Sequence, residues 1–332
     1  MRYLFRGKDT MPRFDLSPKE LHSYRPEVRE PADFDEFWRA TLRDHKPSGA
    51  TPTLVKADGR LSLVDVWDVT FAGFDGHPIR AWLLLPKGAE GPLPGVVQYN
   101  GYGGGRGLPH EHLAWVSAGY AHLFMDTRGQ GSGWGAGGDT PDPVGSGPAS
   151  PGFMTRGIED PASYYYRRVF VDAVCALEVL RGLPQVDPER VAITGGSQGG
   201  AITIAVAGLV DGLAGAMPDV PFMCHFERAV GMTSEDPYNE IVRYLSVHRG
   251  ADERVFETLS YFDGVNFAKR ATAPALFSVA HLDPVCPPST VFAAYNHWAA
   301  QDTGIVEYSF NQHEGGQAWQ WSAQADWLAA RV

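Results

Sequence analysis

The stretch that decides the fold lies at residues 191–200 and reads Val191-Ala192-Ile193-Thr194-Gly195-Gly196-Ser197-Gln198-Gly199-Gly200. Its first four residues are apolar or β-branched, as in a buried strand. A serine between glycines follows in the pattern G-x-S-x-G, and an Ala/Ile-rich, helix-like segment begins at Ala201. This order predicts a serine held in a sharp strand-to-helix turn, where flanking glycines let the backbone pass closely. An ordinary glycine-rich turn is the alternative, and the flanking strand and helix argue against it.

A serine in such a turn acts as a nucleophile only beside a general base, and the base needs an acid that orients it. In proteins built on this turn the chain order is serine, acid, histidine. Asp283 and His313 follow Ser197 in that order, each after a strand-like run. We therefore expect these three residues to form a catalytic triad. A turn aspartate before Pro284 and a surface histidine are the alternatives for the last two.

Acyl transfer also needs donors for the negative charge that develops on the substrate oxygen. Gln198 provides the backbone N–H directly after the serine. The glycine-rich loop, residues 100–107 (N-G-Y-G-G-G-R-G), is the expected source of a second N–H group. A phosphate-binding loop is the other interpretation, but the chain lacks the pattern G-x-x-x-x-G-K-[ST].

Short apolar runs alternate with longer helix-compatible stretches after residue 94, at residues 95–99, 120–125, 191–194, 275–280 and 305–310. This alternation predicts βαβ units and a mostly parallel sheet. Ligand sites in such sheets lie beyond the carboxyl ends of the strands. Residues with chemistry to offer directly follow these runs, namely Tyr102, Arg128, Ser197, Asp283 and His313. We predict an α/β protein with the α/β-hydrolase fold, a mostly parallel central sheet flanked by helices.

The N-terminal part carries helix signals and then a hairpin signal. Ser17-Pro18-Lys19-Glu20 fits a capping box, and Asp33 marks a second helix start. The runs 64–71 and 79–85 predict two strands joined by a turn at residues 74–77. We expect one domain over residues 1–332 with an N-terminal helical extension. Residues 1–10 are a candidate non-native or disordered extension, because Met11 offers an alternative start. The Gly/Pro-rich segment 135–152 is expected to be irregular, as an active-site wall or a surface excursion.

Composition narrows the function classes. Apolar residues make up 44% and charged residues 20%, as in ordinary globular proteins, and the net charge is −11. Nucleic acid and anionic membranes are therefore unexpected partners. No stretch reaches the ~18 apolar residues of a membrane span. Cys175, Cys224 and Cys286 are odd in number and widely spaced, so a disulfide framework is not indicated. Cys224 and Cys286 are interpreted as small apolar residues rather than nucleophiles. We predict a cytoplasmic protein that uses no cofactor and no metal.

The chain resembles the acetyl xylan esterases and cephalosporin C deacetylases, a carbohydrate-esterase branch of the α/β-hydrolases. The resemblance rests on M-D-T-R-G-Q-G-S-G-W (125–134), on G-G-S-Q-G-G (195–200) and on the pair His313-Glu314. Further matching blocks lie at residues 151–158, 164–170, 258–268 and 286–296. The likeness thus covers almost the whole chain.

This resemblance implies a serine esterase that removes acetyl groups through an acyl-enzyme intermediate. It places the triad on Ser197, Asp283 and His313, and the oxyanion donors on the backbone N–H groups of Tyr102 and Gln198. The substrates that it implies are small acetylated molecules, such as acetylated xylo-oligosaccharides and cephalosporin C.

The resemblance also implies an acyl pocket of Tyr102, Trp115 and Pro221, and a homo-hexamer whose active sites face an internal chamber. Arg128 and Gln130 mark the family and are interpreted as supports of the site. His281 departs from the expected pattern, since a histidine there is able to compete for the Asp283 carboxylate. We expect its side chain to point outward instead.

Two other function classes remain as alternatives. The first is a catalytically silent α/β-hydrolase that binds a small ligand, although such proteins usually lose a triad member. The second is a serine peptidase of the prolyl-oligopeptidase type, which normally carries a large extra domain.

Overall fold

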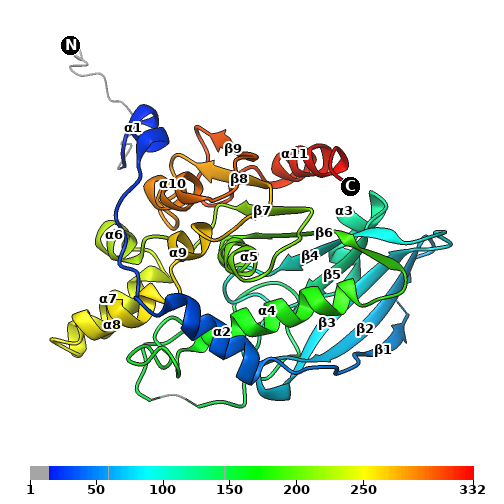
Figure 1. Cartoon of the computed structure of the whole chain (residues 1–332), viewed down its shortest axis with the longest axis horizontal. Coiled ribbons are helices and arrows are strands. Elements are labelled where there is room, and N and C mark those ends of the chain that lie inside the picture. Colours follow the sequence, from blue (N-terminus) through cyan, green and yellow to red (C-terminus); the bar gives the residue numbers. More distant parts are fainter. Residues whose placement is uncertain (1–14, 59, 146) are drawn as a thin grey trace, which may run out of the picture.

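One sheet of nine strands runs through the part of the chain that the computed structural model describes, residues 15–58, 60–145 and 147–332 (Figure 1). Its strand order is β1-β2-β3-β5-β4-β6-β7-β8-β9. The pairs from β1 to β5 are antiparallel, and every pair from β5 through β4 to β9 is parallel. The predicted α/β-hydrolase fold with its mostly parallel sheet is therefore confirmed.

Each strand-like run of the sequence corresponds to a strand. The strands are β1 (Thr53–Ala57), β2 (Val64–Ala72), β3 (Pro78–Pro86), β4 (Leu93–Tyr99), β5 (Ala121–Met125), β6 (Val186–Gly196), β7 (Gly215–Asp219), β8 (Ala275–Ala280) and β9 (Thr303–Tyr308). Two of them, β1 and β7, were not predicted. Strand β7 reads Gly-Ala-Met-Pro-Asp, and its glycine and proline argue against a strand in isolation. Its pairing with β6 overrides that local preference.

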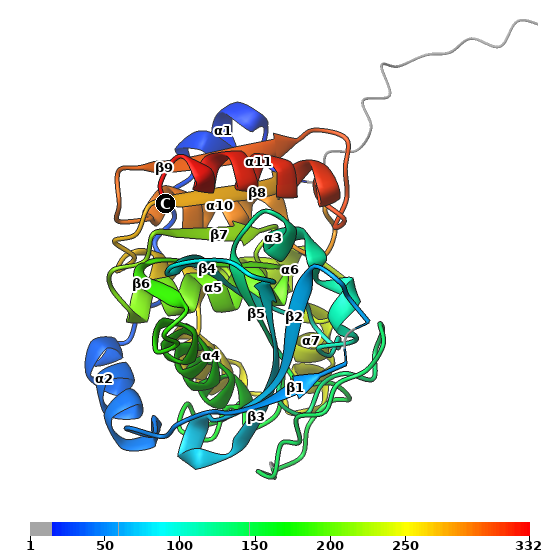
Figure 2. The ribbon, with the colours of Figure 1, turned by 90° about the vertical axis from the view of Figure 1, so that its right-hand side faces the viewer.

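Helices cover both faces of the sheet, as Figure 2 shows. The larger face packs against α4 (Tyr165–Arg181), α5 (Gln198–Leu209), α9 (Gly264–Ala268) and α10 (Pro288–His297), and the smaller against α3 (Leu113–Ser117) and α11 (Gln317–Ala329). Neighbouring residues of one strand enter different cores: Ile193 lies in the large core and Ala192 in the small one. Burial on both faces explains why these strands are continuously apolar.

The remaining helices lie on the periphery of the sheet. They are α1 (Pro18–Ser23), α2 (Phe34–His45), α6 (Phe226–Met232), α7 (Tyr238–Val247) and α8 (Asp252–Ser260), with 3-10 turns at Phe74–Gly76 and Pro109–Glu111. The predicted capping box is confirmed, because the Ser17 backbone N–H and hydroxyl both donate to Glu20. Asp33 precedes α2, but its carboxylate accepts from Tyr261 (2.6 Å) and not from its own helix.

The predicted hairpin is confirmed as well. Strands β2 and β3 pair antiparallel, and the Gly73 N–H donates to the His77 carbonyl at their junction (2.8 Å). The described residues of segment 135–152 are irregular, as expected, and the segment begins beside the glycine-rich loop, where the Gly107 N–H donates to the Gly137 carbonyl (2.9 Å). The suggested extension over residues 1–10 lies outside the described residues, and the single domain over 1–332 stays a prediction.

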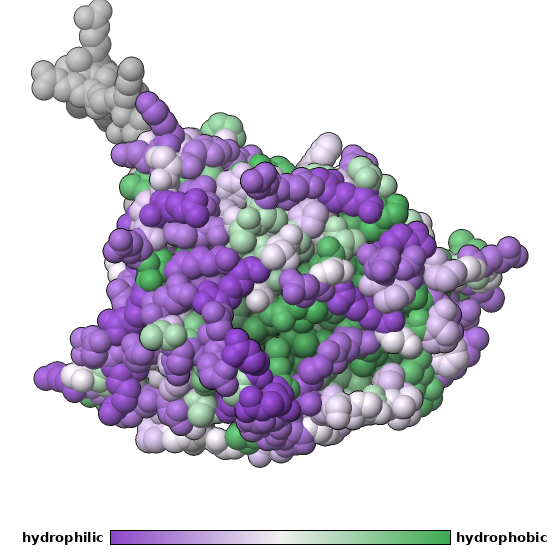
Figure 3. Space-filling model, in the orientation of Figure 1, coloured by the Kyte–Doolittle hydropathy of each residue, from purple (hydrophilic) through white to green (hydrophobic). Residues whose placement is uncertain are grey.

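The face of the molecule seen in Figures 1 and 3 is mostly polar. Figure 3 shows apolar side chains gathered around α4 within it. A cavity of about 420 Å³ opens between α4 and strands β1 and β2, with Leu54, Phe71 and Val179 in its lining. None of the triad candidates lines it. No helix in the described ranges is long and apolar enough to cross a membrane.

Candidate active site

Ser197 lies at the tip of the turn between β6 and α5. Its backbone is left-handed (φ 55°, ψ −115°), which is a strained conformation for a residue with a side chain. Gly199 makes the turn possible, because a Cβ atom there would lie 2.2 Å from the Tyr99 carbonyl oxygen. The Ser197 N–H donates to the Asp219 carbonyl (2.9 Å), and the Phe222 N–H donates to the Ser197 carbonyl (3.0 Å). The predicted strand–turn–helix is thus held from both sides.

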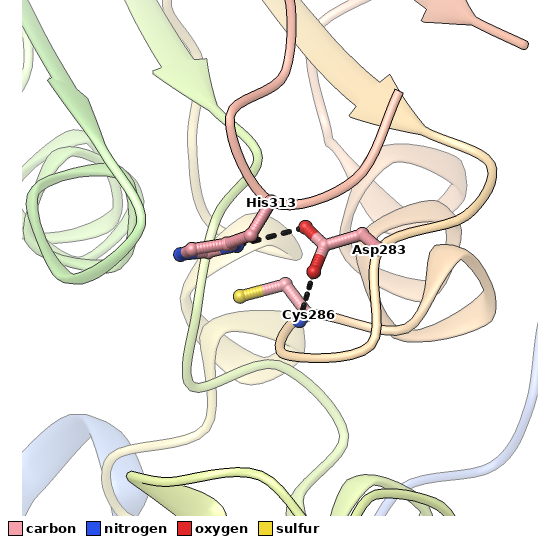
Figure 4. Close-up of side chains that lie close together, drawn as sticks. All are labelled: Asp283, Cys286 and His313. Carbon is pink, nitrogen blue, oxygen red and sulfur yellow. Dashed lines mark hydrogen bonds and ion pairs between the residues drawn. The ribbon is translucent and has the colours of Figure 1, made fainter. Parts of the chain in front are cut away.

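The structure brings Asp283 and His313 to this serine. Figure 4 shows the imidazole of His313 facing the carboxylate of Asp283. His313 Nδ1 lies 2.9 Å from Asp283 Oδ2, and Nε2 lies 3.0 Å from Ser197 Oγ. A carboxylate only accepts, so Nδ1 carries the proton and Nε2 is left as an acceptor for the serine hydroxyl. Strand β8 positions the acid, and the histidine loop, residues 309–316 after β9, positions the base.

Asp283 is fully buried, and its two oxygens have separate tasks. Oδ1 accepts from the backbone N–H groups of Val285 (2.8 Å) and Cys286 (2.9 Å). Oδ2 is thereby aimed at His313. Buried polar groups must be hydrogen-bonded, and both oxygens of this carboxylate meet that condition.

A second carboxylate, which sequence reasoning missed, lies half-buried beside the triad. Burial raises the pKa of Asp219 to about 6, and a hydrogen bond from Ser278 together with the nearby His313 opposes that rise. Its carboxylate faces the histidine loop, since a Cβ atom on Gly315 would lie 3.6 Å from Oδ1. No sequence motif marked Asp219, because it ends β7, one of the two strands that were not predicted.

Tyr102 is held by three polar contacts. Its hydroxyl donates to Glu240 on α7 (2.6 Å) and accepts from the Phe153 N–H (2.5 Å). Its carbonyl accepts from the indole N–H of Trp134 (2.7 Å). Neither the backbone N–H of Tyr102 nor that of Gln198 donates to any residue in the described ranges. Both donors are thus unoccupied at the turn that carries the serine.

Gln198 and Gln130 lock the glycine-rich loop to the nucleophile turn. Gln130 Nε2 donates to Gln198 Oε1 (2.8 Å), and Gln130 Oε1 accepts from the Gly103 N–H (2.7 Å). Gln198 Oε1 also accepts from Tyr166 (2.8 Å), and Gln198 Nε2 donates to the Asn100 carbonyl (3.2 Å). Both glutamines are buried. Their side chains therefore fix the spacing between the two backbone donors.

Arg128 lies behind this network rather than at the reacting serine. It is fully buried, and its guanidinium binds both oxygens of Asp172 (2.6 and 2.7 Å) and one of Asp142 (3.4 Å). Its carbonyl accepts from Tyr165, the same hydroxyl that accepts from Gln130. This position fits a support of the site.

Of the residues assigned to the acyl pocket, Tyr102 and Trp115 pack in different cores. Tyr102 packs against the large core, and Pro221 lies beside the nucleophile turn, against Gly200. Trp115 lies instead in the small core between α3 and α11, where its ring contacts Tyr120 and Trp321. It lines a cavity of about 370 Å³ behind the nucleophile turn.

A different tryptophan, which sequence reasoning missed, lies at Tyr102. Trp134 is 54% exposed, and its backbone forms an isolated parallel β-bridge with Gly104. A Cβ atom on Gly104 would lie 2.3 Å from its ring, so only glycine leaves room for the indole. The signal was available, because Trp134 ends the family block M-D-T-R-G-Q-G-S-G-W.

His281 does not compete for the triad acid. Its Nε2 lies 2.7 Å from Glu307 on the neighbouring strand β9. The side chain turns away from Asp283, as expected, but it is 5% exposed and so is buried in an ion pair rather than solvated.

A model of the acetyl xylan esterase (AXE1) family matches residues 11–331. The chain belongs to this family. An acetyl xylan esterase from Paenibacillus sp. R4 superposes with a TM-score of 0.88 at 41% identity, covering 96% of this chain and 100% of that one. Acetyl xylan esterase 1 from Thermoanaerobacterium sp. JW/SL YS485 gives the same TM-score at 30% identity over 96% and 100%. Family membership places the chain among the carboxylic ester hydrolases.

A longer relative is the acetyl esterase Axe7A from Xylanibacter ruminicola. The two are 26% identical over 319 residues, which is 90% of this chain. The chain spans 66% of that relative's length. The predicted family is confirmed by these likenesses taken together.

Proposed function

We propose that the chain is a serine esterase that removes acetyl groups from small acetylated substrates. One observation carries the proposal: His313 reaches Asp283 at 2.9 Å through one ring nitrogen and Ser197 at 3.0 Å through the other. The family supports the same activity. An unbroken triad with this geometry also argues against a silent ligand-binding hydrolase.

The proposed reaction has two halves. Ser197 Oγ attacks the acetyl carbonyl carbon while its proton passes to His313 Nε2. The alcohol then leaves with that proton, and the acetyl group remains on the serine as an ester. In the second half His313 takes a proton from water, and the resulting hydroxide attacks the carbonyl carbon of the acetyl-enzyme. The bond between that carbon and Ser197 Oγ then breaks, His313 returns the proton to Oγ, and acetic acid leaves and ionises in solvent. Asp283 stabilises the imidazolium that forms in each half.

The oxyanion of each tetrahedral intermediate is assigned to the backbone N–H groups of Tyr102 and Gln198. Both are unoccupied, and the glutamine pair described above holds them at a fixed spacing. Donors that are already in place need no reorganisation as charge develops, and one such donor is worth roughly 10²–10³ in kcat.

Acetyl preference is assigned to side chains around Tyr102. Pro221 stays in this set, and Trp134 takes the place that the family resemblance implied for Trp115, because the indole of Trp134 packs on the glycine-rich loop. Bulky rigid neighbours leave no space for longer acyl chains, and overpacking costs about 1–3 kcal/mol.

The finer points of the proposal are substrate, assembly and location. Acetylated xylo-oligosaccharides are supported by the names of the relatives, and cephalosporin C by the family resemblance. A homo-hexamer is supported by two apolar residues that flank His313 at the surface, Phe310 (78% exposed) and Trp319 (82%), because exposed aromatic side chains favour an interface. A cytoplasmic location stays part of this proposal.

Labelling by a fluorophosphonate probe, measured together with the hydrolysis of three substrates, tests the proposal. We expect labelling of the wild type, rapid hydrolysis of an aryl acetate and of acetylated xylo-oligosaccharides, and no cleavage of a peptide amide. Absence of labelling would support the silent alternative. Cleavage of the amide in preference to the ester would support the peptidase alternative.

A further inference from the structure

Cys286 is a buried thiol that the proposed reaction does not use. It lies in the turn after Asp283, and Figure 4 shows its sulfur beside the His313 ring. One carboxylate oxygen of Asp283, the Cys286 sulfur and one ring nitrogen of His313 all lie within 4.8 Å of one another. In the described part of the chain, no other three His, Cys, Asp or Glu side chains converge in this way.

We propose that Asp283, Cys286 and His313 form an inhibitory binding site for a borderline or soft divalent cation. The cations that we expect it to bind are Zn²⁺ and Cd²⁺. Carboxylate, thiolate and imidazole are the donors that Zn²⁺ takes, at about 2.0–2.3 Å. Donors around one tetrahedral ion lie about 3–4 Å apart. The present spread of up to 4.8 Å is thus within about 1–2 Å of that around a bound ion.

The imidazole that would bind the ion also reaches the reacting serine, since His313 Nε2 lies 3.0 Å from Ser197 Oγ. A cation held on this ring is therefore next to the nucleophile. Cys286 binds such an ion as a thiolate, so binding of one cation releases the thiol proton to solvent.

Inhibition follows from the identity of the ligands, and this step rests on the proposed function. A cation on the His313 ring withdraws the base that takes the serine proton, and it shares the carboxylate that orients that base. Asp283 and Cys286 are 0% and 1% exposed, whereas the His313 side chain is 32% exposed. Of the three ligands, the imidazole is therefore the one open to a cation that arrives from solvent.

Two readouts on metal-free enzyme test the site. Zn²⁺, Cd²⁺, Mg²⁺ and Ca²⁺ are titrated while aryl acetate hydrolysis is followed. In parallel, Cd²⁺ is titrated while the ultraviolet charge-transfer absorption of a cadmium–thiolate bond is recorded. We expect reversible inhibition by Zn²⁺ and Cd²⁺ that EDTA relieves, a saturable thiolate band, and no effect of the hard cations Mg²⁺ and Ca²⁺, which prefer oxygen ligands.

Substitutions then assign the ligand. Cys286→Ser and Cys286→Ala, each normalised to its own metal-free rate, should lose the band. Both should need at least about tenfold more Zn²⁺ for half-inhibition, since even an outer partner of a metal ligand is worth 10–100-fold in affinity. Cys175→Ser is the matched control, because this buried cysteine lies on α4, outside the site, and should leave both readouts unchanged.

Inhibition of equal strength in both Cys286 variants, or no thiolate band in the wild type, would overturn the site. A band that saturates in an enzyme without esterase activity would support the site and refute the proposed function. The two claims therefore fail separately.

Discussion

The two sides of the candidate active site are built differently. The glycine-rich loop, residues 100–107, is anchored by buried groups from several elements, such as Gln130 and Asp126. The histidine loop, residues 309–316, is largely at the surface, and its side-chain contacts are mostly local, as between Asn311 and Glu314 (3.0 Å). Its ties to the rest of the site are the hydrogen bonds of His313 with Asp283 and Ser197 and one from the Leu282 N–H to the Asn311 carbonyl (3.1 Å). The glycine-rich loop, which would bind the oxyanion, is therefore rigid. The general base, His313, depends on Asp283 for its orientation.

The largest effect is expected at the three residues where both sides meet. Ser197→Ala and His313→Ala should each lower kcat by roughly 10⁵–10⁶, because a triad acts as a unit. The double variant should lose little more than either single variant. Steady-state kinetics with an aryl acetate measure this. Losses that add in the double variant would show that one of the two residues is misassigned.

The second prediction contrasts the two loops directly. Gln130→Ala removes the anchor of the Gly103 N–H and of the Gln198 side chain, so kcat should fall roughly 10–10²-fold, part of the value of one oxyanion donor. Asn311→Ala removes a solvated contact in the histidine loop and should change kcat by less than about threefold.

Thermal unfolding of both variants separates a loss of activity from a loss of fold. Equal effects of Gln130→Ala and Asn311→Ala on kcat would contradict the contrast between a rigid loop and a locally held one.

The third prediction concerns pH and the carboxylate that faces the histidine loop. The pKa of Asp219 is about 6 in the fold against 3.8 as the ordinary value. The stabilisation tied to its proton is therefore present below pH 3.8 and is lost as pH rises through about 6, by at most about 3 kcal/mol.

Asp219→Asn lacks this titration. Its free energy of unfolding, compared with that of the wild type in urea at pH 4 and pH 7, should improve toward pH 7. The same difference between the two proteins at both pH values would show that this carboxylate does not titrate as inferred.

The fourth and smallest effect separates the two tryptophans. The wild type should lose roughly tenfold in kcat/KM from acetyl to butyryl esters, since about 1.4 kcal/mol is a factor of ten. Trp134→Ala should relax this preference, and Trp115→Phe, in the small core, should not. A series of aryl esters measures the profile of each variant. If Trp115→Phe alone alters the profile, the original assignment of the acyl pocket was better.

The accuracy of the sequence-based predictions depended on how local the signal was. The turn at Ser197 is encoded by adjacent residues, and the order of Asp283 and His313 is a rule of chain topology, so both were predictable. Strand β7 was not, because its Gly and Pro are tolerated only through pairing with β6. Trp134 was missed because contact with Tyr102 joins distant segments.

Cys286 shows the same limit for chemistry. From the sequence, Cys286 is interpreted as a small apolar residue, and its burial agrees with that interpretation. Only the fold places its sulfur beside the His313 ring, because His313 lies in a different loop, the one that follows β9. Composition and spacing carry no information about such a convergence.

The most direct test of the central claim is to trap the intermediate. Wild type is mixed with an aryl acetate, quenched within one turnover, digested and analysed by mass spectrometry, beside the His313→Ala variant. The account predicts an acetyl group on the peptide that contains Ser197 in the wild type, with a burst of aryl alcohol that approaches one equivalent, and neither in the variant. Hydrolysis of the ester at full rate with the acetyl group on another residue, or with Ser197 never acetylated, would contradict it.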